Sequence, residues 1–436
     1  MRLHPAVAAT GRRFLQLALL GLLVGVACWP FNLLDHWQDQ MLKQLPLFTG
    51  EDWGPTSLAL AALPLLLMPL LLVLQAGAWR RGAGSGIPQT MVCLEQPALA
   101  PDLLSPAPTL QRLLLWSIAT VGLLPLGREG PVVQMGAAVA SWLRRRHPGL
   151  LAELETADLV AVAGGAGLAA GFNTPLMGTI FVAEELTARF QVGLIWPALL
   201  SCAVAAGISN LGGQPEFALG LLRVAPGEGS QLFWAVPVGL LAGLLGALFA
   251  RLLLQVTAQL TPLARRHPLR IGLALGLILS LFLLLSQGAS GGDGEALMGW
   301  MINRDAGSLP WLQHLVALLT RLIGPCLALG AGVPGGLIDP AFALGALFGQ
   351  GVSLFGGASS VGLALGMTAG LAGATQLPVL SIVFALRLAG DQQLLPGMLL
   401  AAVLGAYMSR MLGLQPVYHA LTHPLREALG LNSLPG

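Results

Sequence analysis

Charged side chains are scarce in this sequence. They make up 10% of its 436 residues, whereas 55% of the residues are hydrophobic. A soluble domain carries about 25% charged residues, so this chain has too few to cover a water-facing surface. Together with the mean hydropathy of +0.76, this indicates an integral membrane protein that crosses the bilayer several times. The composition excludes a soluble enzyme, and the net charge of +2 gives no reason to expect a nucleic-acid partner.

Cysteines are also few and lack the spacing of a metal site. The four are Cys28, Cys93, Cys202 and Cys326, and none belongs to a CxxC pair. Because they lie in or beside apolar stretches, we expect packed or lipid-facing thiols without a disulfide or a bound metal. A sustained period-2 alternation is missing as well, which makes a β-barrel a poor fit.

Apolar segments of two lengths follow one another along the chain. The longer ones can each cross about 30 Å of hydrocarbon and lie near residues 14–34, 57–78, 110–126, 193–211, 232–257, 270–286, 309–333 and 393–414. The shorter ones are bounded by glycine or proline and lie near residues 131–143, 157–171, 175–188, 340–355, 358–372 and 376–388. We expect the shorter ones to be half-helices that end inside the membrane, where protein or a cavity must satisfy their free backbone groups. The predicted fold class is therefore an all-α polytopic membrane protein with broken, tilted and half-spanning helices.

An internal repeat relates the two halves of the chain. Residues 127–137 and 336–346 share the pattern GxxxPxxxxGA, and residues 167–181 match 370–384 in the same order. We therefore expect residues 1–436 to form a single transmembrane domain of two related halves, about 14–211 and 232–425. An odd number of crossings in each half would make the repeats inverted, and broken helices at matching positions then point to a substrate site near the membrane midplane.

The segment 127–131 has the features of a helix start that attracts an anion. Gly127 and Gly130 allow a sharp turn, and Pro131 suits the first turn of a helix. Free N–H groups and the helix dipole favour an anion at such a start. The ionised carboxylate of Glu129 can occupy that site and leave it when protonated. The alternative is an inert capping glutamate paired with Arg128.

Two further segments have the same character. The first consists of Gly84, Ser85, Gly86, Ile87 and Pro88, and the second runs from Gly336 to Pro340 in the repeat-related position. The hydroxyl of Ser85 can donate a hydrogen bond to an anion. Three such helix starts in one membrane chain predict a site where uncharged donors bind an anion strongly enough to replace water and weakly enough to release it.

Acidic and aromatic residues near helix ends are additional candidates. Glu184 and Glu185 end a short apolar helix, where a carboxylate is a candidate proton acceptor; the alternative is a pair that reaches the interface beside Arg189. Tyr418 follows the last apolar span, and its hydroxyl can reach into a vestibule or belong to an interfacial belt. His419 lies four residues before His423, but no third ligand is near in sequence, so we expect no metal site.

These motifs together resemble those of the CLC family of chloride channels and transporters. The resemblance rests on GSGIP at 84–88, GREGP at 127–131 and GGLIDP at 335–340, followed by the late Tyr418. Residues 172–186 and, more loosely, 291–295 are also similar, so that the resemblance runs from about residue 14 to 425. It implies two inverted repeats per subunit and a homodimer in the lipid bilayer with one anion pathway in each subunit. Chloride and protons are then the transported species, with no cofactor.

The resemblance also implies roles for individual residues. The hydroxyls of Ser85 and Tyr418 bind the central chloride, and the backbone amides of Leu337 and Ile338 complete that site. Glu129 is the gate and competes with chloride for one positive field.

Glu185 is the inner proton acceptor of the exchangers, and family channels commonly lack a carboxylate there, so its presence favours Cl⁻/H⁺ antiport. A passive chloride channel of the same fold is the main alternative, and a transporter of another solute is a weaker one. A remote alternative is an intramembrane serine protease, with Ser290 as nucleophile and His314 or His419 as base.

The chain departs from the family pattern at three positions. Ile338 replaces an aromatic residue, Asp339 precedes Pro340, and Gln89 stands where glutamate is frequent. We interpret Asp339 as a helix cap whose side chain is turned away from the pathway. Ser85 favours chloride over the fluoride-type branch. The chain stops soon after its last apolar span and is rich in arginine, which suggests a prokaryotic inner membrane.

Overall fold

The fold is built almost entirely of helices. A computed structural model describes residues 5–211, 231–303, 310–355, 358–387 and 392–431. Within these ranges the one strand-like feature is a bridge between Gly127 and Gly336, so the predicted all-α polytopic fold is confirmed. The predicted segments 309–333 and 376–388 each include one residue, 309 and 388, that lies outside the described residues.

Six helical segments in the described part of the chain are long and apolar enough to cross a membrane. They are α1 (Pro5–Leu42), α3 with α4 (Pro55–Ala61 and Leu63–Ala76), α11 (Val192–Ser209), α12 (Gln231–Arg266), α13 (Pro268–Leu285) and α15 (Trp311–Gly330). The other two predicted spans are shorter helices, α7 (Pro106–Val121) and α19 (Leu395–Met411). The chain is thus an integral membrane protein with several apolar helices.

The predicted half-helices appear at their expected places. They are α8 (Glu129–Arg146), α9 (Thr156–Phe172), α10 (Pro175–Phe181), α16 (Ile338–Gln350), α17 (Ser359–Thr375) and α18 (Pro378–Leu386). Helix α8 is longer than the predicted segment 131–143, because its last turn carries three arginines, which suit the negative end of a helix dipole. Apolarity alone could not place that end.

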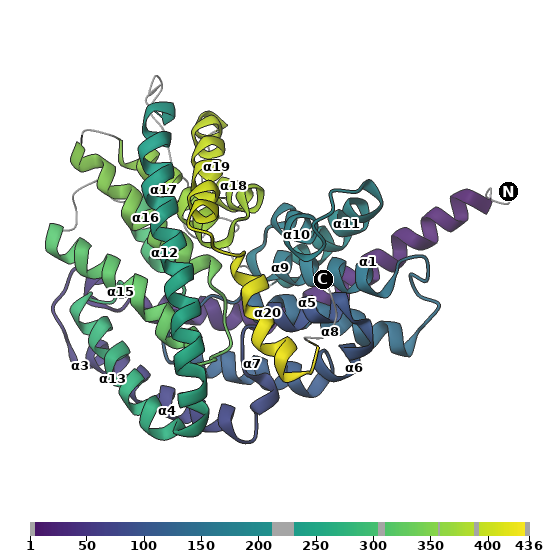
Figure 1. Ribbon diagram of the computed structural model, residues 1–436, viewed down its shortest axis with the longest axis horizontal. Coiled ribbons are helices and arrows are strands. Elements are labelled where there is room, and N and C mark those ends of the chain that lie inside the picture. The colour runs from purple at the N-terminus through teal and green to yellow at the C-terminus, as the bar shows by residue number, and fades with distance from the viewer. Residues whose placement is uncertain (1–4, 212–230, 304–309, 356–357, 388–391, 432–436) are drawn as a thin grey trace.

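Shorter helices complete the chain. They are α2 (Pro46–Thr49), α5 (Ile87–Glu95), α6 (Ala100–Leu103), α14 (Glu295–Ile302), α20 (Val417–Ala428), the π-helical turn η3 (Val182–Leu186) and the 3₁₀ turns η1 (Arg80–Gly82), η2 (Pro97–Leu99), η4 (Gly351–Phe355) and η5 (Gln392–Leu394). In Figure 1, helices α8–α11 gather on one side and α15–α19 on the other, while α20 runs back against α5.

Glycines allow close helix packing in both of these groups. Helix α8 packs on α9 where a Cβ at Gly136 would meet the carbonyl of Ala163, and α16 packs on α17 where a Cβ at Gly345 would meet the carbonyl of Gly366. Small residues at such contacts let helix backbones approach within a membrane. Gly136 and Gly345 occupy the same place in the repeated GxxxPxxxxGA pattern. The helix pairs α8–α9 and α16–α17 therefore pack closely through the same glycine of the repeat.

The two repeat-related motifs meet in the interior of the protein. The N–H of Gly127 donates to the carbonyl of Gly336 at 3.0 Å, and the N–H of Gly336 donates to the carbonyl of Gly127 at 2.9 Å. This antiparallel pair satisfies buried backbone groups that would otherwise lack partners. It also brings the starts of α8 and α16 next to each other.

We predict that Gly345→Ala destabilises the fold. The added Cβ meets the Gly366 carbonyl, and overpacking of this kind costs about 1–3 kcal/mol. The melting temperature of the purified protein in detergent should fall by several degrees. Gly207→Ala is the matched control, because Gly207 lies on an exposed face of α11 with no atom within 4 Å of an added Cβ. Equal melting temperatures for the two variants would contradict this account of the α16–α17 contact.

Candidate functional site

Three helix N-termini converge in the structure. Helix α5 begins at Ile87, α8 at Glu129 and α16 at Ile338. Gly86 has a φ of +116° and lies against the carbonyl of Gly130, so that α5 meets the start of α8. The Gly127–Gly336 bridge joins α8 to α16. The structure thus brings together the three segments that the sequence singled out.

Two buried hydroxyls lie at this convergence. Ser85 lies directly against Gly130, and Tyr418, near the start of α20, is 1% exposed. The Tyr418 ring packs edge-on against Phe181, with the ring centroids 6.5 Å apart. Neither Ser85 Oγ nor Tyr418 Oη has a hydrogen-bond partner among the described residues. Burying such a group unpaired costs about 1–3 kcal/mol, so both hydroxyls are available to a ligand that accepts hydrogen bonds.

A cavity of about 650 Å³ reaches this place. Ser85 and Leu337 line it, together with Gly84 and Pro88 of the first motif. Arg265 also lines it and adds a positive charge. Leu337 precedes α16 and Ile338 is its first residue, so their N–H groups belong to the first turn and have no intrahelical acceptor. The cavity therefore connects one of the free hydroxyls with a helix N-terminus.

Glu129 reaches the start of the neighbouring half-helix. It is fully buried, and its Oε1 accepts the Asp339 N–H at 2.7 Å. Its Oε2 has no hydrogen-bond partner in the described chain. The carboxylate of Glu129 therefore lies where an anion would bind at the N-terminus of α16. The alternative paired this glutamate with Arg128, but no hydrogen bond or ion pair joins the two side chains in the described chain, and the contacts of Arg128 go to other groups.

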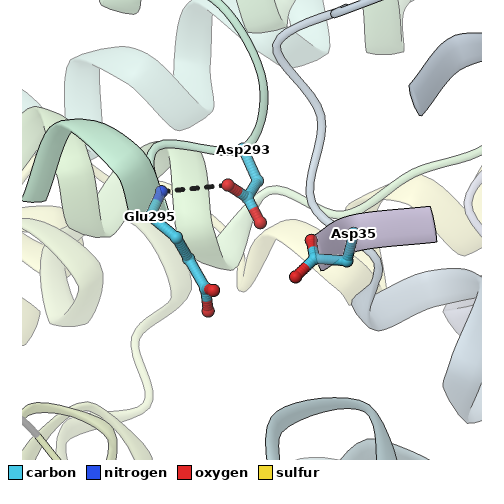
Figure 2. Close-up of side chains that lie close together, drawn as sticks. All are labelled: Asp35, Asp293 and Glu295. Carbon is cyan, nitrogen blue, oxygen red and sulfur yellow. Dashed lines mark hydrogen bonds between the residues drawn. The ribbon is translucent and has the colours of Figure 1, made fainter. Parts of the chain in front are cut away.

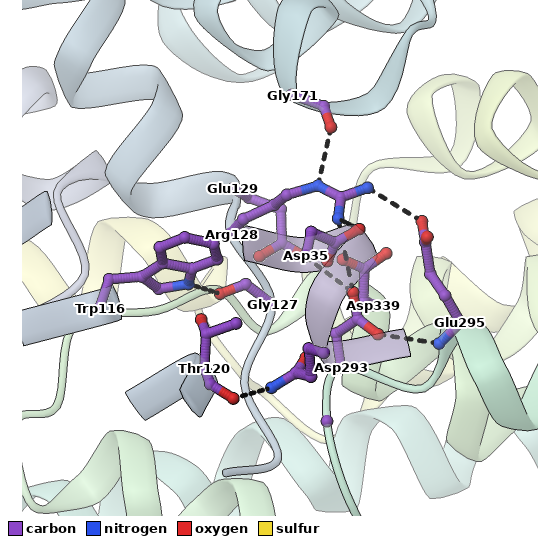
Figure 3. Close-up of polar contacts among 12 residues, drawn as sticks. Asp35, Trp116, Thr120, Gly127, Arg128, Glu129, Gly171, Asp293, Glu295 and Asp339 are labelled. Carbon is purple, nitrogen blue, oxygen red and sulfur yellow. Dashed lines mark hydrogen bonds and ion pairs between the residues drawn. The ribbon is translucent and has the colours of Figure 1, made fainter. Parts of the chain in front are cut away.

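Arg128 is instead held in a buried ionic network, which Figure 3 shows. Its Nε donates to the carbonyl of Gly171 at 2.7 Å, and its guanidinium lies 4.7 Å from the centroid of the Phe172 ring. It pairs with Asp35 on α1 and, through Nη2, with Glu295 Oε1 at 3.2 Å. These contacts fix the turn that carries Glu129.

The acidic side of this network has three carboxylates. Asp35, Asp293 and Glu295 have ligand-type oxygens within 4.8 Å of one another, and the N–H of Glu295 donates to Asp293 Oδ1 at 2.9 Å (Figure 2). Arg128 forms ion pairs with all three, so a guanidinium already supplies the positive charge there. Sequence analysis missed Asp35, whose signal was a carboxylate directly after the long apolar run 14–34.

A second buried arginine holds the loop that carries Ser85. Arg112, on α7, donates from Nη2 to the carbonyl of Ala83 and from Nε to the carbonyl of Gly84, each at 2.9 Å. The side chain of Gln89 accepts the N–H of Gly86 at 2.9 Å. The amide at position 89 thus caps the start of α5 in place of the glutamate that is frequent there.

The two glutamates of the pair on η3 have different environments. Glu184 accepts the N–H groups of Val379 at 3.0 Å and Leu380 at 2.7 Å, which caps the start of α18. Glu185 is 4% exposed, and its Oε1 has no hydrogen-bond partner in the described ranges. His419 Nε2 lies 4.0 Å from that oxygen. Glu185 is therefore the glutamate of the pair with an unsatisfied buried carboxyl oxygen.

The alternative for this pair involved Arg189 at the membrane interface. Arg189 pairs with Asp158 instead, and both glutamates make the contacts given above. The part of this interpretation that paired the glutamates with Arg189 is therefore wrong. The sequence could not show this, because Asp158 is distant in the chain and approaches only in the fold.

The structure also contradicts the interpretation of Asp339 as a helix cap. It is fully buried, and neither of its carboxylate oxygens has a hydrogen-bond partner in the described part of the chain. A cap would accept a backbone N–H at the helix start. Instead, the backbone N–H of Asp339 donates to Glu129, and Figure 3 places its side chain beside the Arg128 network.

The site of the protease alternative does not form. Ser290 Oγ hydrogen-bonds with Ser286 Oγ at 3.1 Å. His314 contacts the carbonyl of Leu347 at 2.9 Å, and His419 lies beside Glu185. Neither histidine is placed to activate Ser290. The four cysteines are buried and unpaired.

Comparisons with known proteins identify the family. Residues 66–410 match the family described as voltage gated chloride channel. The voltage-gated ClC-type chloride channel ClcB of Escherichia coli is 27% identical over 308 residues, which cover 68% of this chain and 71% of the relative.

Solved structures show the same fold. A slow cyanobacterial Cl⁻/H⁺ antiporter matches with a TM-score of 0.76 and 22% identity, covering 98% of this chain and all of the other. A CLC-type fluoride/proton antiporter matches with a TM-score of 0.70 and 23% identity, covering 92% of this chain and 95% of the other. The chain therefore belongs to the CLC family of voltage gated chloride channels, whose members are membrane transport proteins and not enzymes.

Proposed function

We propose that this protein transports chloride and couples its movement to protons as a Cl⁻/H⁺ antiporter. Family membership supports chloride as the substrate. The observation that carries the proposal is the position of Glu129, whose carboxylate accepts a backbone N–H at the start of α16. A side chain that can be neutralised by a proton thus lies where an anion would bind. No cofactor is needed for this exchange.

Chloride binds at the convergence of the helix N-termini. The hydroxyls of Ser85 and Tyr418 donate to the ion, and the amides of Leu337 and Ile338 complete its shell. Support comes from the two buried hydroxyls, which lack partners in the described chain, and from the cavity that reaches Ser85 and Leu337. All these donors are uncharged, which suits an ion that must bind and leave again.

Coupling follows from competition for one electrostatic field. Ionised Glu129 and chloride are both anions, and the N-terminus of α16 favours either one. Protonation of Glu129 removes its charge, so the side chain leaves and chloride takes its place. When chloride leaves, the carboxylate returns and loses its proton. Each turn of the cycle then moves protons and chloride in opposite directions.

Glu185 supplies the inner end of the proton path. It is buried, and Tyr418 lies close enough to interact electrostatically with both Glu129 and Glu185. Protons and chloride then share the region around Tyr418 and separate on the inner side, where His419 lies beside Glu185. Glu184 has no part in transfer, because its oxygens cap α18.

We further propose that the single domain 1–436 is made of two inverted repeats, about 14–211 and 232–425. The Gly127–Gly336 bridge and the matching glycine contacts of α8 with α9 and of α16 with α17 support this arrangement. By analogy with the family, we propose a homodimer with one pathway in each subunit. The bacterial relatives support a place in the inner membrane.

We predict that Glu129→Gln and Glu185→Gln each abolish coupled proton movement. In proteoliposomes with an imposed chloride gradient and no proton gradient, the wild-type protein should drive protons uphill. Glu129→Gln removes the carboxylate that competes with chloride, and Glu185→Gln blocks the inner proton step. Chloride flux should persist in both variants, measured with a chloride electrode.

Glu153→Gln is the control for these variants, because Glu153 pairs with Arg13 at an exposed site and should leave coupling unchanged. Chloride flux without any proton movement in the wild-type protein would contradict antiport and support the passive channel. No chloride flux from the folded protein would contradict chloride transport itself.

We predict that Tyr418→Phe weakens chloride binding. A hydrogen bond to a charged group contributes about 1.5–3 kcal/mol, which corresponds to roughly tenfold or more in Kd. Isothermal titration calorimetry with chloride measures this change. Tyr407→Phe is the matched control, since Tyr407 is the other tyrosine of the chain and is 54% exposed. Equal chloride affinities of Tyr418→Phe and Tyr407→Phe would contradict a role of the Tyr418 hydroxyl in chloride binding.

A further inference from the structure

The proposed exchange uses Glu129 and Glu185, but a third buried carboxyl group borders the same site. Asp339 is the second residue of α16, and its backbone N–H holds Glu129 Oε1 at 2.7 Å. Its side chain is fully buried, and both oxygens lack hydrogen-bond partners within the described ranges. A buried carboxylate without donors is costly when ionised and becomes stable by taking a proton.

Charged and titratable groups approach Asp339 from several elements. They are Glu129 on α8, Arg128 just before it, Asp293 and Glu295 at the start of α14, Arg321 on α15 and Tyr418 on α20. Asp35 on α1 faces the same Arg128. Figure 3 shows the Asp339 side chain among Glu129, Arg128 and Asp293. These neighbours therefore determine whether Asp339 is ionised or protonated.

The arginines near Asp339 are already committed to other partners. Arg128 pairs with Asp35, Asp293 and Glu295. Arg321 donates its N–H groups to the carbonyls of the glycine-rich loop before α14, namely those of Ala289, Gly291 and Gly292. No ion pair joins either arginine to Asp339 or Glu129 in the described chain. The positive groups therefore hold the loops in place and leave these two carboxyl groups without a counter-ion of their own.

The balance of charge also favours bound protons. Five carboxyl groups belong to this region: Asp35, Glu129, Asp293, Glu295 and Asp339. Three guanidinium groups face them: Arg128, Arg321 and Arg387. Full ionisation would leave an excess of negative charge in an apolar interior, and neighbouring carboxylates that share a site cannot readily both ionise. Protons are the simplest neutralising species, and Glu129 and Asp339 are the members without ion pairs.

We propose that Asp339 is a second proton-binding residue of the transport site, which takes up a proton when chloride binds. This inference rests on the chloride/proton exchange proposed above. When chloride replaces the carboxylate of Glu129 at the start of α16, the negative charge beside Asp339 belongs to an ion that, unlike a carboxylate, cannot take up a proton itself. A proton from the aqueous phase then adds to a carboxylate oxygen of Asp339 and gives the neutral acid. The same proton is released when chloride leaves.

The proposal predicts that the protein takes up more protons per bound chloride than Glu129 alone can accept. Chloride binding should take up protons at both Glu129 and Asp339. Substitution of Glu129 should therefore lower the uptake without abolishing it. This separates a proton-binding Asp339 from a purely structural one, since a structural residue would add nothing to the uptake.

The test measures protons taken up per chloride bound by the full-length protein in detergent. Calorimetry gives chloride binding, and a pH indicator in weak buffer gives the proton uptake. We expect uptake in the wild-type protein, a smaller but measurable uptake in Glu129→Gln, and none in Glu129→Gln/Asp339→Asn. The exposed Asp102 provides the control, and Asp102→Asn should behave as the wild type.

A further variant removes the other proton acceptor and avoids any folding defect at position 339. Glu129→Gln/Glu185→Gln keeps Asp339 and should still take up protons with chloride. No uptake in this variant, or equal uptake in Glu129→Gln with and without Asp339→Asn, would overturn the role of Asp339. Failure of the wild-type protein to bind chloride would instead overturn the proposed function.

Discussion

Half-helices that end inside a membrane must find partners for their free backbone groups, and this requirement governs the centre of the molecule. The reciprocal hydrogen bonds between Gly127 and Gly336 satisfy part of it. Of the other N–H groups in these first turns, that of Asp339 donates to the side chain of Glu129. Close glycine contacts at Gly136 and Gly345 allow the supporting helices to hold these ends in place. The anion site that we propose is thus a product of how the fold satisfies its own backbone.

Buried arginines fix the geometry around these helix ends. Arg112 holds the loop before Ser85 through backbone carbonyls, and Arg128 holds the turn before Glu129 through Gly171 and the acidic cluster. The guanidinium groups of Arg112 and Arg128 are thus committed to the scaffold. In the transport cycle that we propose, uncharged donors bind chloride and protonation of carboxyl groups controls access to the site.

Much of this could be predicted from the sequence, and the limits have physical causes. Apolar length and glycine or proline boundaries placed the half-helices, and the repeat pointed to segments that meet in the fold. Contacts between residues that are distant in the sequence could not be predicted. Asp158 pairs with Arg189, and Glu184 accepts a backbone N–H at the start of α18. Asp339 was interpreted as a cap because a carboxylate near a helix start usually is one. Only the fold shows that its oxygens lack donors in the described chain.

The central claim is that an anion binds where the three helix starts meet. Crystals of the protein soaked in bromide, which scatters anomalously, test it most directly. The account predicts an anomalous peak within hydrogen-bond distance of Ser85 Oγ and Tyr418 Oη, near the first turn of α16, and a weaker peak in crystals of Ser85→Ala. A peak only at the protein surface would contradict it, and so would a peak at the predicted place that is equally strong in crystals of Ser85→Ala.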